Sequence, residues 1–359
     1  MNTYNIHENF MSRAIHLAKK GRGKVSPNPM VGCVIVKNGK IIGEGFHKKF
    51  GGDHAEVDAF KNCTDDPTDA SLYVTLEPCS HFGKTGPCCN AIIENGIRDV
   101  YISMSDPNKK VNGNGIDFLK NSGINVECNI LKNESKELNK GYINWIKTKK
   151  PLVIGKMAQD SNGYIAKSGS KIWITGHSSK QNSHQLRSEV DAILVGKNTV
   201  LIDNPELTVR EVIGSNPKRI VLDTNRTLPY NFKLLKDEEA DTIIMCSNKK
   251  FQNSETSHCK YITVNEINEK LDLNDVLIKL GELGITSLLV EGGATTIKSF
   301  LDVELIEKFY LYTSSLSKNE LDIKNPFSIN DNWIVQNEKF LDEDHLVVLN
   351  KRVECLQEL

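Results

Sequence analysis

Hydrophobic positions along the first 145 residues alternate between helical spacing and short strand-like runs. The segment ENFMSRAIHLAKKG has its apolar residues on one helical face and ends at glycine, so it predicts a helix. MVGCVIVKNGKIIGEGF contains two strand-like runs around Asn38-Gly39, a strong hairpin signal. Helices and strands then alternate: a helix from about Ala55, strand SLYVTL, a helix from Pro87 through NAIIENG, strand DVYISM, helix GIDFLKNSG and strand NVECNIL. This order predicts a sheet covered by helices.

The alternation begins again after WIKTKKP. Short apolar runs typical of buried strands are separated by helical stretches such as SSKQNSHQLRSEV and LNDVLIKLGELG; the strand-like runs are PLVIGKMA, DAILVG, RIVLD, DTIIMC and SLLVEGG. KTKK at 147–150 lies where the composition changes and is typical of a solvated linker. We therefore expect two α/β domains, residues 1–147 and 148–359.

Composition narrows the class of protein. A chain of 359 residues, with 39% hydrophobic and 25% charged residues, has the make-up of a globular protein with two cores. The start has no apolar segment typical of a signal peptide, and no run approaches the roughly 18 apolar residues of a membrane span. We expect a cytoplasmic protein without membrane association. The net charge of -1 argues against broad nucleic-acid binding. Nine irregularly spaced cysteines favour free thiols or metal ligands over disulfides.

The segments HAEVDAF and EPCSHFGKTGPC suggest a metal site. His54, Cys79 and Cys88 offer one imidazole and two thiolates, a set that suits zinc and leaves a fourth position for water, as in catalytic zinc sites. Cys89 is an alternative to Cys88. We favour Cys88 because it directly follows Pro87, a preferred first helical residue, and a helix N-terminus favours a thiolate.

Glu56 is the candidate catalytic group. It lies about 200° around an ideal helix from His54, so both side chains can face one pocket only if His54 stands at the very start of the helix. The functional interpretation is that zinc-activated water attacks an amidine-type ring carbon, while Glu56 carries the proton to the departing amine without binding the metal. A structural zinc site is the alternative interpretation. A histidine, a glutamate two residues later, and then Pro-Cys and a second cysteine, in this order, favour catalysis.

Nucleic-acid deaminases space their two cysteines as Cys-x-x-Cys, whereas eight residues separate Cys79 from Cys88 here. NPMVGCVIV, GDHAEV, TLEPCSHFGKTGPC and SHQLRSEVDAILVGKNTVLIDNPELTVR resemble the bifunctional deaminase-reductases of riboflavin biosynthesis, and the resemblance runs through both domains. It implies a cytidine-deaminase-like three-layer α/β domain followed by a dihydrofolate-reductase-like α/β domain. It also implies a small phosphoribosylated diaminopyrimidinone as substrate. Its ring amino group is hydrolysed to give a uracil, and NADPH then reduces the ribosyl group to ribityl.

The resemblance implies specific contacts. Substrate contacts in the first domain would come from Asn28, His47, His81, Lys84, Asp106 and Asn108. In the second domain the cofactor would lie against Ala158, Trp173, Thr199 and Asp203, and the substrate against Arg187, Leu207, Arg210 and Glu291. Two arginines suit a phosphate, and the strand, glycine turn and helix start around Gly292-Gly293 offer backbone N–H groups to cofactor phosphate. Taken singly, these residues also fit turns, surface ion pairs or core packing.

Three positions depart from the family pattern: Gly86 replaces proline, Asn162 replaces aspartate before glycine, and Lys171 replaces serine. Asn162 still suits a turn, and Lys171 could contact a substrate phosphate as a cation. Two other functions compete with the bifunctional one. One is a tRNA or nucleoside deaminase with an appended nucleotide-binding domain, and the other is a non-catalytic protein with structural zinc. Glu56 argues against the second. We expect one zinc per chain, NADPH as cofactor and no nucleic-acid partner; the sequence is compatible with a homo-oligomer.

Overall fold

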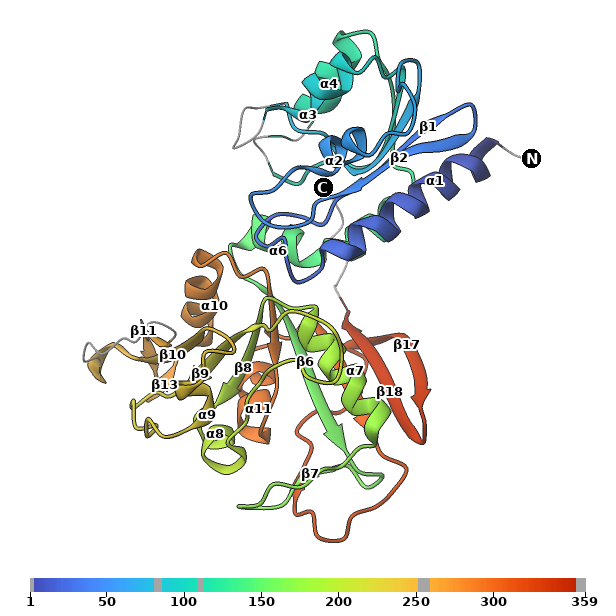
Figure 1. Ribbon diagram of the computed structural model, residues 1–359. Coiled ribbons are helices and arrows are strands. Elements are labelled where there is room, and N and C mark those ends of the chain that lie inside the picture. The colour runs from blue at the N-terminus through green and yellow to red at the C-terminus, as the bar shows by residue number, and fades with distance from the viewer. Residues whose placement is uncertain (1–2, 81–85, 109–110, 112, 251–258, 353–359) are drawn as a thin grey trace. The chain divides into compact units, whose positions relative to one another are not determined.

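The chain divides into two compact units, Met1–Lys149 and Lys150–Leu359. A computed structural model, shown in Figure 1, describes residues 3–80, 86–108, 111, 113–250 and 259–352. The division lies just beyond helix α6 (Lys140–Thr148), whose C-cap Lys149 has a left-handed φ of 61°. The expected linker KTKK is therefore partly helical, because its first two residues complete the last turn of α6.

The described part of the first unit is built on a five-stranded sheet in the order β2-β1-β3-β4-β5. β1 is antiparallel to β2 and β3, and β3, β4 and β5 are parallel. The strands are β1 (Gly32–Lys37), β2 (Lys40–Phe46), β3 (Ser71–Leu76), β4 (Asp99–Met104) and β5 (Asn125–Cys128). The helices are α1 (Thr3–Ala18), a 3-10 turn (Lys19–Gly21), α2 (Ala55–Lys61), α3 (Cys88–Glu94), α4 (Asn114–Asn121), α5 (Lys132–Leu138) and α6. The expected hairpin at Asn38-Gly39 joins β1 and β2, and both residues have positive φ.

Helices cover both faces of this sheet (Figure 1). One apolar cluster joins the sheet to α2, α3 and α4, and a second joins it to α1 and α5. Two glycines let helix backbones approach closely: a Cβ on Gly32 would lie 2.0 Å from the carbonyl oxygen of Ala14 in α1, and one on Gly45 would lie 2.2 Å from the amide nitrogen of Ala59 in α2. The expected three-layer α/β arrangement is confirmed, with α2 held tightly against the sheet.

The described part of the second unit contains a nine-stranded sheet in the order β11-β10-β9-β8-β14-β6-β15-β18-β17. Pairing is parallel from β11 to β15, and β18 and β17 add an antiparallel hairpin. The sheet strands are β6 (Leu152–Gln159), β8 (Ala192–Gly196), β9 (Lys218–Leu222), β10 (Thr242–Ser247), β11 (Cys259–Val264), β14 (Ser287–Val290), β15 (Lys308–Thr313), β17 (Trp333–Leu341) and β18 (Asp344–Lys351). Short two-stranded ladders join β7 (Tyr164–Ala166) to β16 (Ile323–Lys324) and β12 (Glu266–Ile267) to β13 (Lys270–Leu271).

Two apolar clusters sandwich this larger sheet. One includes α10 and α11, and the other includes α7, α8 and α9. The helices are α7 (His177–Ser188), α8 (Lys197–Asp203), α9 (Lys233–Lys236), α10 (Leu273–Glu282) and α11 (Ala294–Asp302), with a 3-10 turn at Asn248–Lys250. The expected second α/β domain is confirmed. No helix within the described ranges is both long and apolar enough to cross a lipid bilayer.

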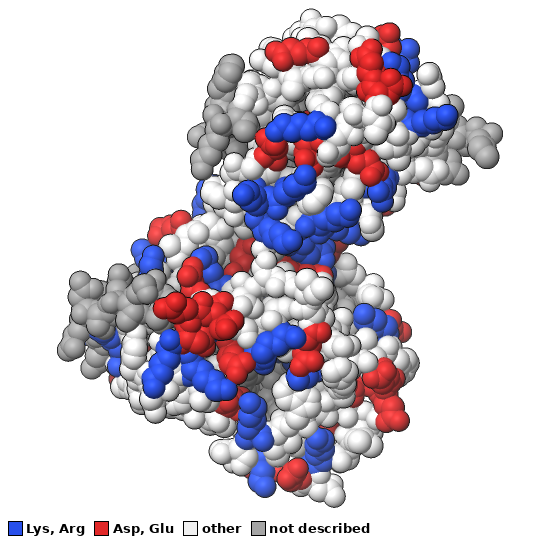
Figure 2. All heavy atoms as spheres, in the orientation of Figure 1, with Lys and Arg blue, Asp and Glu red and all other residues white. Residues whose placement is uncertain are grey.

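Charged side chains of both signs are interspersed over the face of the second unit drawn in Figure 2. On the first unit, basic side chains gather over the C-terminal end of α1. Several cations of the first unit are paired with carboxylates: Arg13 lies 2.6 Å from Glu44, and Lys48 lies 2.7 Å from Asp58. Both pairs have exposed or half-exposed cations, so each contributes only about 0 to 1 kcal/mol to stability.

Candidate active sites

Three predicted metal ligands converge at two helix starts in the first unit. His54 is the N-cap residue of α2 with extended backbone (φ -72°, ψ 161°), Cys79 follows β3, and Cys88 is the first residue of α3. The ligand atoms of all three lie within 4.8 Å of one another. His54 Nδ1 is 3.2 Å from the Cys88 sulfur and 3.6 Å from the Cys79 sulfur.

These spacings fit a zinc ion. Metal-ligand bonds of about 2.0 to 2.3 Å in a tetrahedron place neighbouring ligand atoms about 3.3 to 3.8 Å apart. The nitrogen-sulfur distances of 3.2 and 3.6 Å are close to that range. One imidazole and two thiols are also the soft and borderline donors that zinc prefers. A fourth position remains for a water or substrate atom, as in catalytic sites.

Cys89 points away from this cluster. Its sulfur lies 3.5 Å from the carbonyl oxygen of Pro78 and 3.7 Å from that of Gly115, and its side chain is fully buried in the core beneath α3. Burial, with the nearby negative groups, raises the pKa of the Cys89 thiol to about 12. The alternative in which Cys89 replaces Cys88 therefore does not fit the geometry.

The two ligand sulfurs differ in how readily each ionises. The hydrogen bond from Cys88 lowers the pKa of Cys79 to about 4 against the opposing effect of burial, and the Cys88 backbone N–H also donates to that sulfur at 3.3 Å. The same hydrogen bond, together with burial, raises the pKa of Cys88 well above its usual value. The expectation that the helix N-terminus favours a Cys88 thiolate stays a prediction for the zinc-bound cluster. Zinc binding must displace the Cys88 proton.

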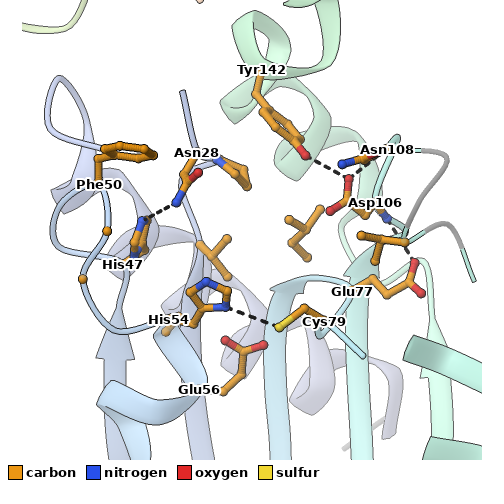
Figure 3. Close-up of a pocket in the computed structure, with 17 residues that line it drawn as sticks. Asn28, His47, Phe50, His54, Glu56, Glu77, Cys79, Asp106, Asn108 and Tyr142 are labelled. Carbon is orange, nitrogen blue, oxygen red and sulfur yellow. Dashed lines mark hydrogen bonds between the residues drawn. The ribbon is translucent and has the colours of Figure 1, made fainter. Parts of the chain in front are cut away.

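Glu56 lies in the first turn of α2 and is only 3% exposed. Figure 3 shows its carboxylate directed toward His54 and Cys79. The N-cap position of His54 brings both side chains to one pocket, which the helical spacing alone would forbid. Burial raises the pKa of Glu56 to about 6, with the charge of His54 opposing. A carboxyl group with a pKa near working pH suits proton transfer.

A cavity of about 330 Å³ opens beside these groups (Figure 3). It is lined by the cluster and by four predicted substrate residues: His54, Glu56, Cys79, Asn28, His47, Asp106 and Asn108. The other two substrate residues predicted in this domain, His81 and Lys84, lie outside the described residues.

His47 has a defined protonation state. Its Nδ1 lies 2.8 Å from the carbonyl oxygen of Asp53, which can only accept a hydrogen bond, so Nδ1 carries the proton. Its Nε2, 3.1 Å from the side-chain nitrogen of Asn28, then accepts a hydrogen bond from that amide. Burial lowers the pKa of His47, which keeps the ring neutral. Asn28 is therefore held by a neutral imidazole, and its position in the cavity wall is fixed.

Glu77 organises the opposite wall and was not predicted from the sequence. Its carboxylate is 4% exposed and accepts hydrogen bonds from the backbone N–H groups of Asp106, Gly113 and Gly115 at 3.0 to 3.2 Å. These bonds hold the segment that carries Asp106. A glutamate directly before Pro-Cys in a buried strand end was a usable signal, since buried carboxylates need several donors.

In the second unit, Arg187 and Glu291 form a two-pronged ion pair. The guanidinium Nε and Nη2 lie 3.1 and 2.8 Å from the two carboxylate oxygens, and the side chains are 14% and 9% exposed. Burial opposes ionisation, but the charges of Arg187 and Lys156 lower the pKa of Glu291 to about 2. The exposed salt bridge considered for Arg187 is therefore excluded. Lys156 was not predicted, although a lone lysine in the run PLVIGKMA was a signal.

Four of the predicted cofactor residues, Ala158, Thr199, Gly292 and Gly293, lie at or just beyond the carboxyl ends of adjacent parallel strands. β8 leads into α8, β14 leads into Gly292-Gly293, and Ala158 is near the end of β6. Thr199 Oγ1 in α8 accepts a hydrogen bond from the Gly293 backbone N–H at 3.2 Å. Gly292 has φ of 108°, and a Cβ there would lie 2.8 Å from Thr199 Oγ1. Only glycine fits this turn, which ends at the N-cap of α11.

Trp173 and Lys171 lie in the segment between β7 and α7. Trp173 is 54% exposed, so core packing does not explain it, and Lys180 Nζ lies 5.5 Å from its ring centroid. Lys171 Nζ donates to the backbone carbonyl of Asp203 at 3.4 Å. Burial raises the pKa of the Asp203 carboxyl, with Lys171 opposing. This hydrogen bond places Lys171 next to Asp203, a predicted cofactor residue.

Leu207 and Arg210 lie in the loop after α8. Leu207 is buried and has φ of 55°. The Arg210 backbone N–H donates to Nδ1 of buried His184 at 3.0 Å, and its guanidinium contacts Glu206 at 2.7 Å. Arg210 also lines a cavity of about 550 Å³. Asn162 lies in the expected turn, where its backbone N–H donates to the Asp160 carboxylate at 3.0 Å.

Comparisons with known proteins agree with these two sites. Residues 4–104 match the zinc-binding region of cytidine and deoxycytidylate deaminases, and residues 151–316 match the RibD C-terminal domain. The chain therefore joins a zinc-binding deaminase domain to a reductase domain that uses a nucleotide cofactor. Riboflavin biosynthesis protein RibD of Aquifex aeolicus is 41% identical over 357 residues, covering 97% of this chain and 99% of the relative. The chain belongs to the RibD family of bifunctional deaminase-reductases of riboflavin biosynthesis.

Solved structures show the same likeness over both domains. A diaminohydroxyphosphoribosylaminopyrimidine deaminase/5-amino-6-(5-phosphoribosylamino)uracil reductase from Thermotoga maritima has a TM-score of 0.88 and 37% identity, covering 97% of this chain and 99% of its own. RibD of Acinetobacter baumannii has a TM-score of 0.86 and 31% identity, covering 98% and 100%. Because these likenesses span both domains, the alternative of a nucleoside deaminase with an unrelated appendage is wrong, and so is that of a non-catalytic zinc protein.

Proposed function

We propose that this chain hydrolyses the ring amino group of 2,5-diamino-6-(5-phosphoribosylamino)pyrimidin-4-one and then reduces the ribosyl group of the product to ribityl with NADPH. The observation that carries the first step is the cluster of His54, Cys79 and Cys88, of which His54 and Cys79 line one cavity together with the buried Glu56. The substrate class is that of the similar deaminase/reductase from Thermotoga maritima. The deaminase activity is assigned to residues 1–147 and the reductase activity to 148–359.

In the deaminase step, His54, Cys79 and Cys88 would hold one zinc per chain, which when bound makes a water nucleophilic at neutral pH. Glu56 accepts the proton of the attacking water and delivers it to the departing amine. Its carboxylate is directed toward His54 and Cys79, where it can take a proton from a water at the cluster and release it again (Figure 3). The pyrimidine and its phosphoribosyl group are held by polar residues of the cavity and of the segment between the cysteines: Asn28, His47, His81, Lys84, Asp106 and Asn108.

In the reductase step, NADPH lies along the carboxyl ends of β6, β8 and β14. The residues proposed to contact it are Ala158, Trp173, Thr199, Asp203, Gly292 and Gly293. The glycine turn supports this placement, because its backbone approaches α8 closely and leads into a helix N-terminus. The residues proposed to hold the substrate are Lys171, Arg187, Leu207, Arg210 and Glu291. The cations among them suit a phosphate group.

Product analysis tests the two reactions. Zinc-loaded protein given the diaminopyrimidinone alone is expected to release one ammonia per substrate and to accumulate the ribosylated uracil. Addition of NADPH is then expected to convert that product to the ribityl compound, with one NADPH consumed per molecule. Chromatography and absorbance at the NADPH band measure both. Absence of ammonia release by zinc-loaded protein would rule out the proposed deamination, whatever the reductase does.

Two substitutions test the cofactor site. Asp203→Ala and Trp173→Ala are each expected to weaken NADPH binding about tenfold, which corresponds to about 1.4 kcal/mol of lost contact. Zinc content is expected to stay unchanged. Fluorescence titration with the nucleotide measures the affinity, and Asp302→Ala, which removes an exposed carboxylate paired with Lys298, is the matched control. Wild-type affinity in both variants would place the cofactor elsewhere.

A further inference from the structure

Helices α5 and α6 lie between the two segments that match family models. The deaminase match ends at residue 104, and the reductase match begins at residue 151. They are nevertheless part of the first compact unit, and one side chain of α6, Tyr142, lines the deaminase cavity. Neither Tyr142 nor any other residue of these helices belongs to the residues proposed to contact substrate or cofactor. Their contacts with the cavity walls point to an indirect role.

Tyr142 fixes Asp106. The phenol is 8% exposed, and its hydroxyl donates to Asp106 Oδ1 at 3.0 Å. The same oxygen accepts the backbone N–H of Asn108 at 2.8 Å. Figure 3 shows the ring entering from α6 and pointing at Asp106. Burial and the negative charge of Asp106 raise the pKa of Tyr142, so the hydroxyl remains a donor. A hydrogen bond to a carboxylate is among the stronger neutral-donor contacts, and here it sets the rotamer of Asp106.

Asn139 holds the other wall. It is the N-cap residue of α6, three residues before Tyr142, and is 2% exposed. Its Oδ1 accepts the Met30 backbone N–H at 2.8 Å, and its Nδ2 donates to the Met30 carbonyl at 2.9 Å. Met30 follows Asn28-Pro29, both of which line the cavity. An amide that satisfies both polar groups of one residue holds that backbone much as a neighbouring strand would.

We propose that the first turn of α6 positions two walls of the deaminase cavity and thereby sets its affinity for the pyrimidine substrate. Tyr142 acts through Asp106, and Asn139 acts through Met30 on the wall that carries Asn28. Figure 3 shows these walls on opposite sides of the metal-ligand cluster. The proposal rests on the deamination proposed above. Its physical basis is that side chains that contact a substrate must be held within about 0.5 Å of their productive positions, so that a small displacement of either wall weakens binding.

The first test removes one hydroxyl. Tyr142→Phe in the zinc-loaded full chain is expected to raise KM for deamination about tenfold, with kcat changed by less than about twofold, because the zinc cluster and Glu56 are untouched. Zinc content and reduction of substrate that has been deaminated beforehand should match wild type. Tyr73→Phe is the control, since it removes a hydroxyl of the same unit that bonds His7 at 2.8 Å instead of a cavity residue.

A double-mutant cycle separates positioning from direct contact. If Tyr142 acts through Asp106, deamination by the Tyr142→Phe, Asp106→Asn double variant should equal that of Asp106→Asn alone. Losses that multiply would show that Tyr142 acts independently of Asp106 and would overturn the proposal. Wild-type KM in Tyr142→Phe alongside a loss in Asp106→Asn would also overturn it, while leaving the proposed function standing. No effect of Asp106→Asn would overturn both the positioning role and the assignment of Asp106 to the substrate site.

Asn139 is tested by a pair of substitutions. Asn139→Ala removes both hydrogen bonds, whereas Asn139→Asp keeps the acceptor for the Met30 N–H but sets a buried carboxylate oxygen against the Met30 carbonyl oxygen. We expect KM to rise about tenfold in each variant, because each removes the hydrogen bond to the Met30 carbonyl. Circular dichroism and zinc content identify which variants are folded, and either folded variant decides the question. Wild-type KM in a folded Asn139→Ala or a folded Asn139→Asp would contradict the proposed role of Asn139.

Discussion

Replacing Glu56 with glutamine is expected to slow deamination by about 10² to 10⁴-fold, the usual contribution of a general acid-base group. Glutamine keeps the shape of the buried side chain but cannot take up the water proton. Zinc should remain bound, because Glu56 lies outside the group of ligand atoms formed by His54, Cys79 and Cys88. NADPH consumption measures the result when the variant is offered first the diaminopyrimidinone and then its deaminated product.

The deaminated product is the internal control for this variant. The predicted reductase residues all lie in the unit Lys150–Leu359, so reduction of that product should proceed at the wild-type rate. Failure of a folded variant to reduce either compound would mean that the two units are not independent catalysts. Wild-type reduction of the diaminopyrimidinone would mean that reduction does not need prior deamination, and the proposed order of steps would be reversed.

Removing a zinc ligand is expected to abolish deamination together with the metal. Elemental analysis should give about one zinc per wild-type chain and little in Cys79→Ala or Cys88→Ala, because two remaining ligands cannot hold a catalytic zinc tightly. Cys89→Ala should retain zinc. Its sulfur faces the carbonyl oxygens of Pro78 and Gly115 in the core.

Cys89→Ala is a close control, since it removes the same atoms one residue away. Some loss of stability is expected in it, because the side chain is fully buried, so zinc should be measured on folded protein. Zinc loss in Cys89→Ala with retention in Cys88→Ala would reverse the choice of ligand.

The metal cluster could be predicted from the sequence because its chemistry is local. His54 and Glu56 are two residues apart, and their side chains can face one pocket if His54 precedes the helix. The structure meets this condition, because His54 is the N-cap residue and its backbone is extended. The charge state of Cys88 could not be predicted in the same way. It depends on a hydrogen bond with the Cys79 sulfur, nine positions earlier, which lowers the pKa of Cys79 and raises that of Cys88 in the folded cluster.

Several elements were not predicted from the sequence. Helix α5 is short and mostly polar. Helix α6 does carry apolar residues at helical spacing, Tyr142, Ile143 and Ile146, and this signal was missed. Strand β17 is exposed along nearly its whole length, so its sequence lacks the alternation of a half-buried strand. Lys156 was visible as a lone charge in an apolar run, but its meaning depends on Glu291, which only the pairing of β6 with β14 brings near.

The position of α6 bears on how the gene for such a chain could be divided. A fragment ending at residue 104 would keep Glu56 and all three zinc ligands, and would look complete by its motif. It would lack Asp106 and both side chains of α6 that hold the cavity walls. Recombination between two relatives would therefore exchange a complete deaminase domain only when the crossover falls at about residues 149 and 150, beyond the last turn of α6.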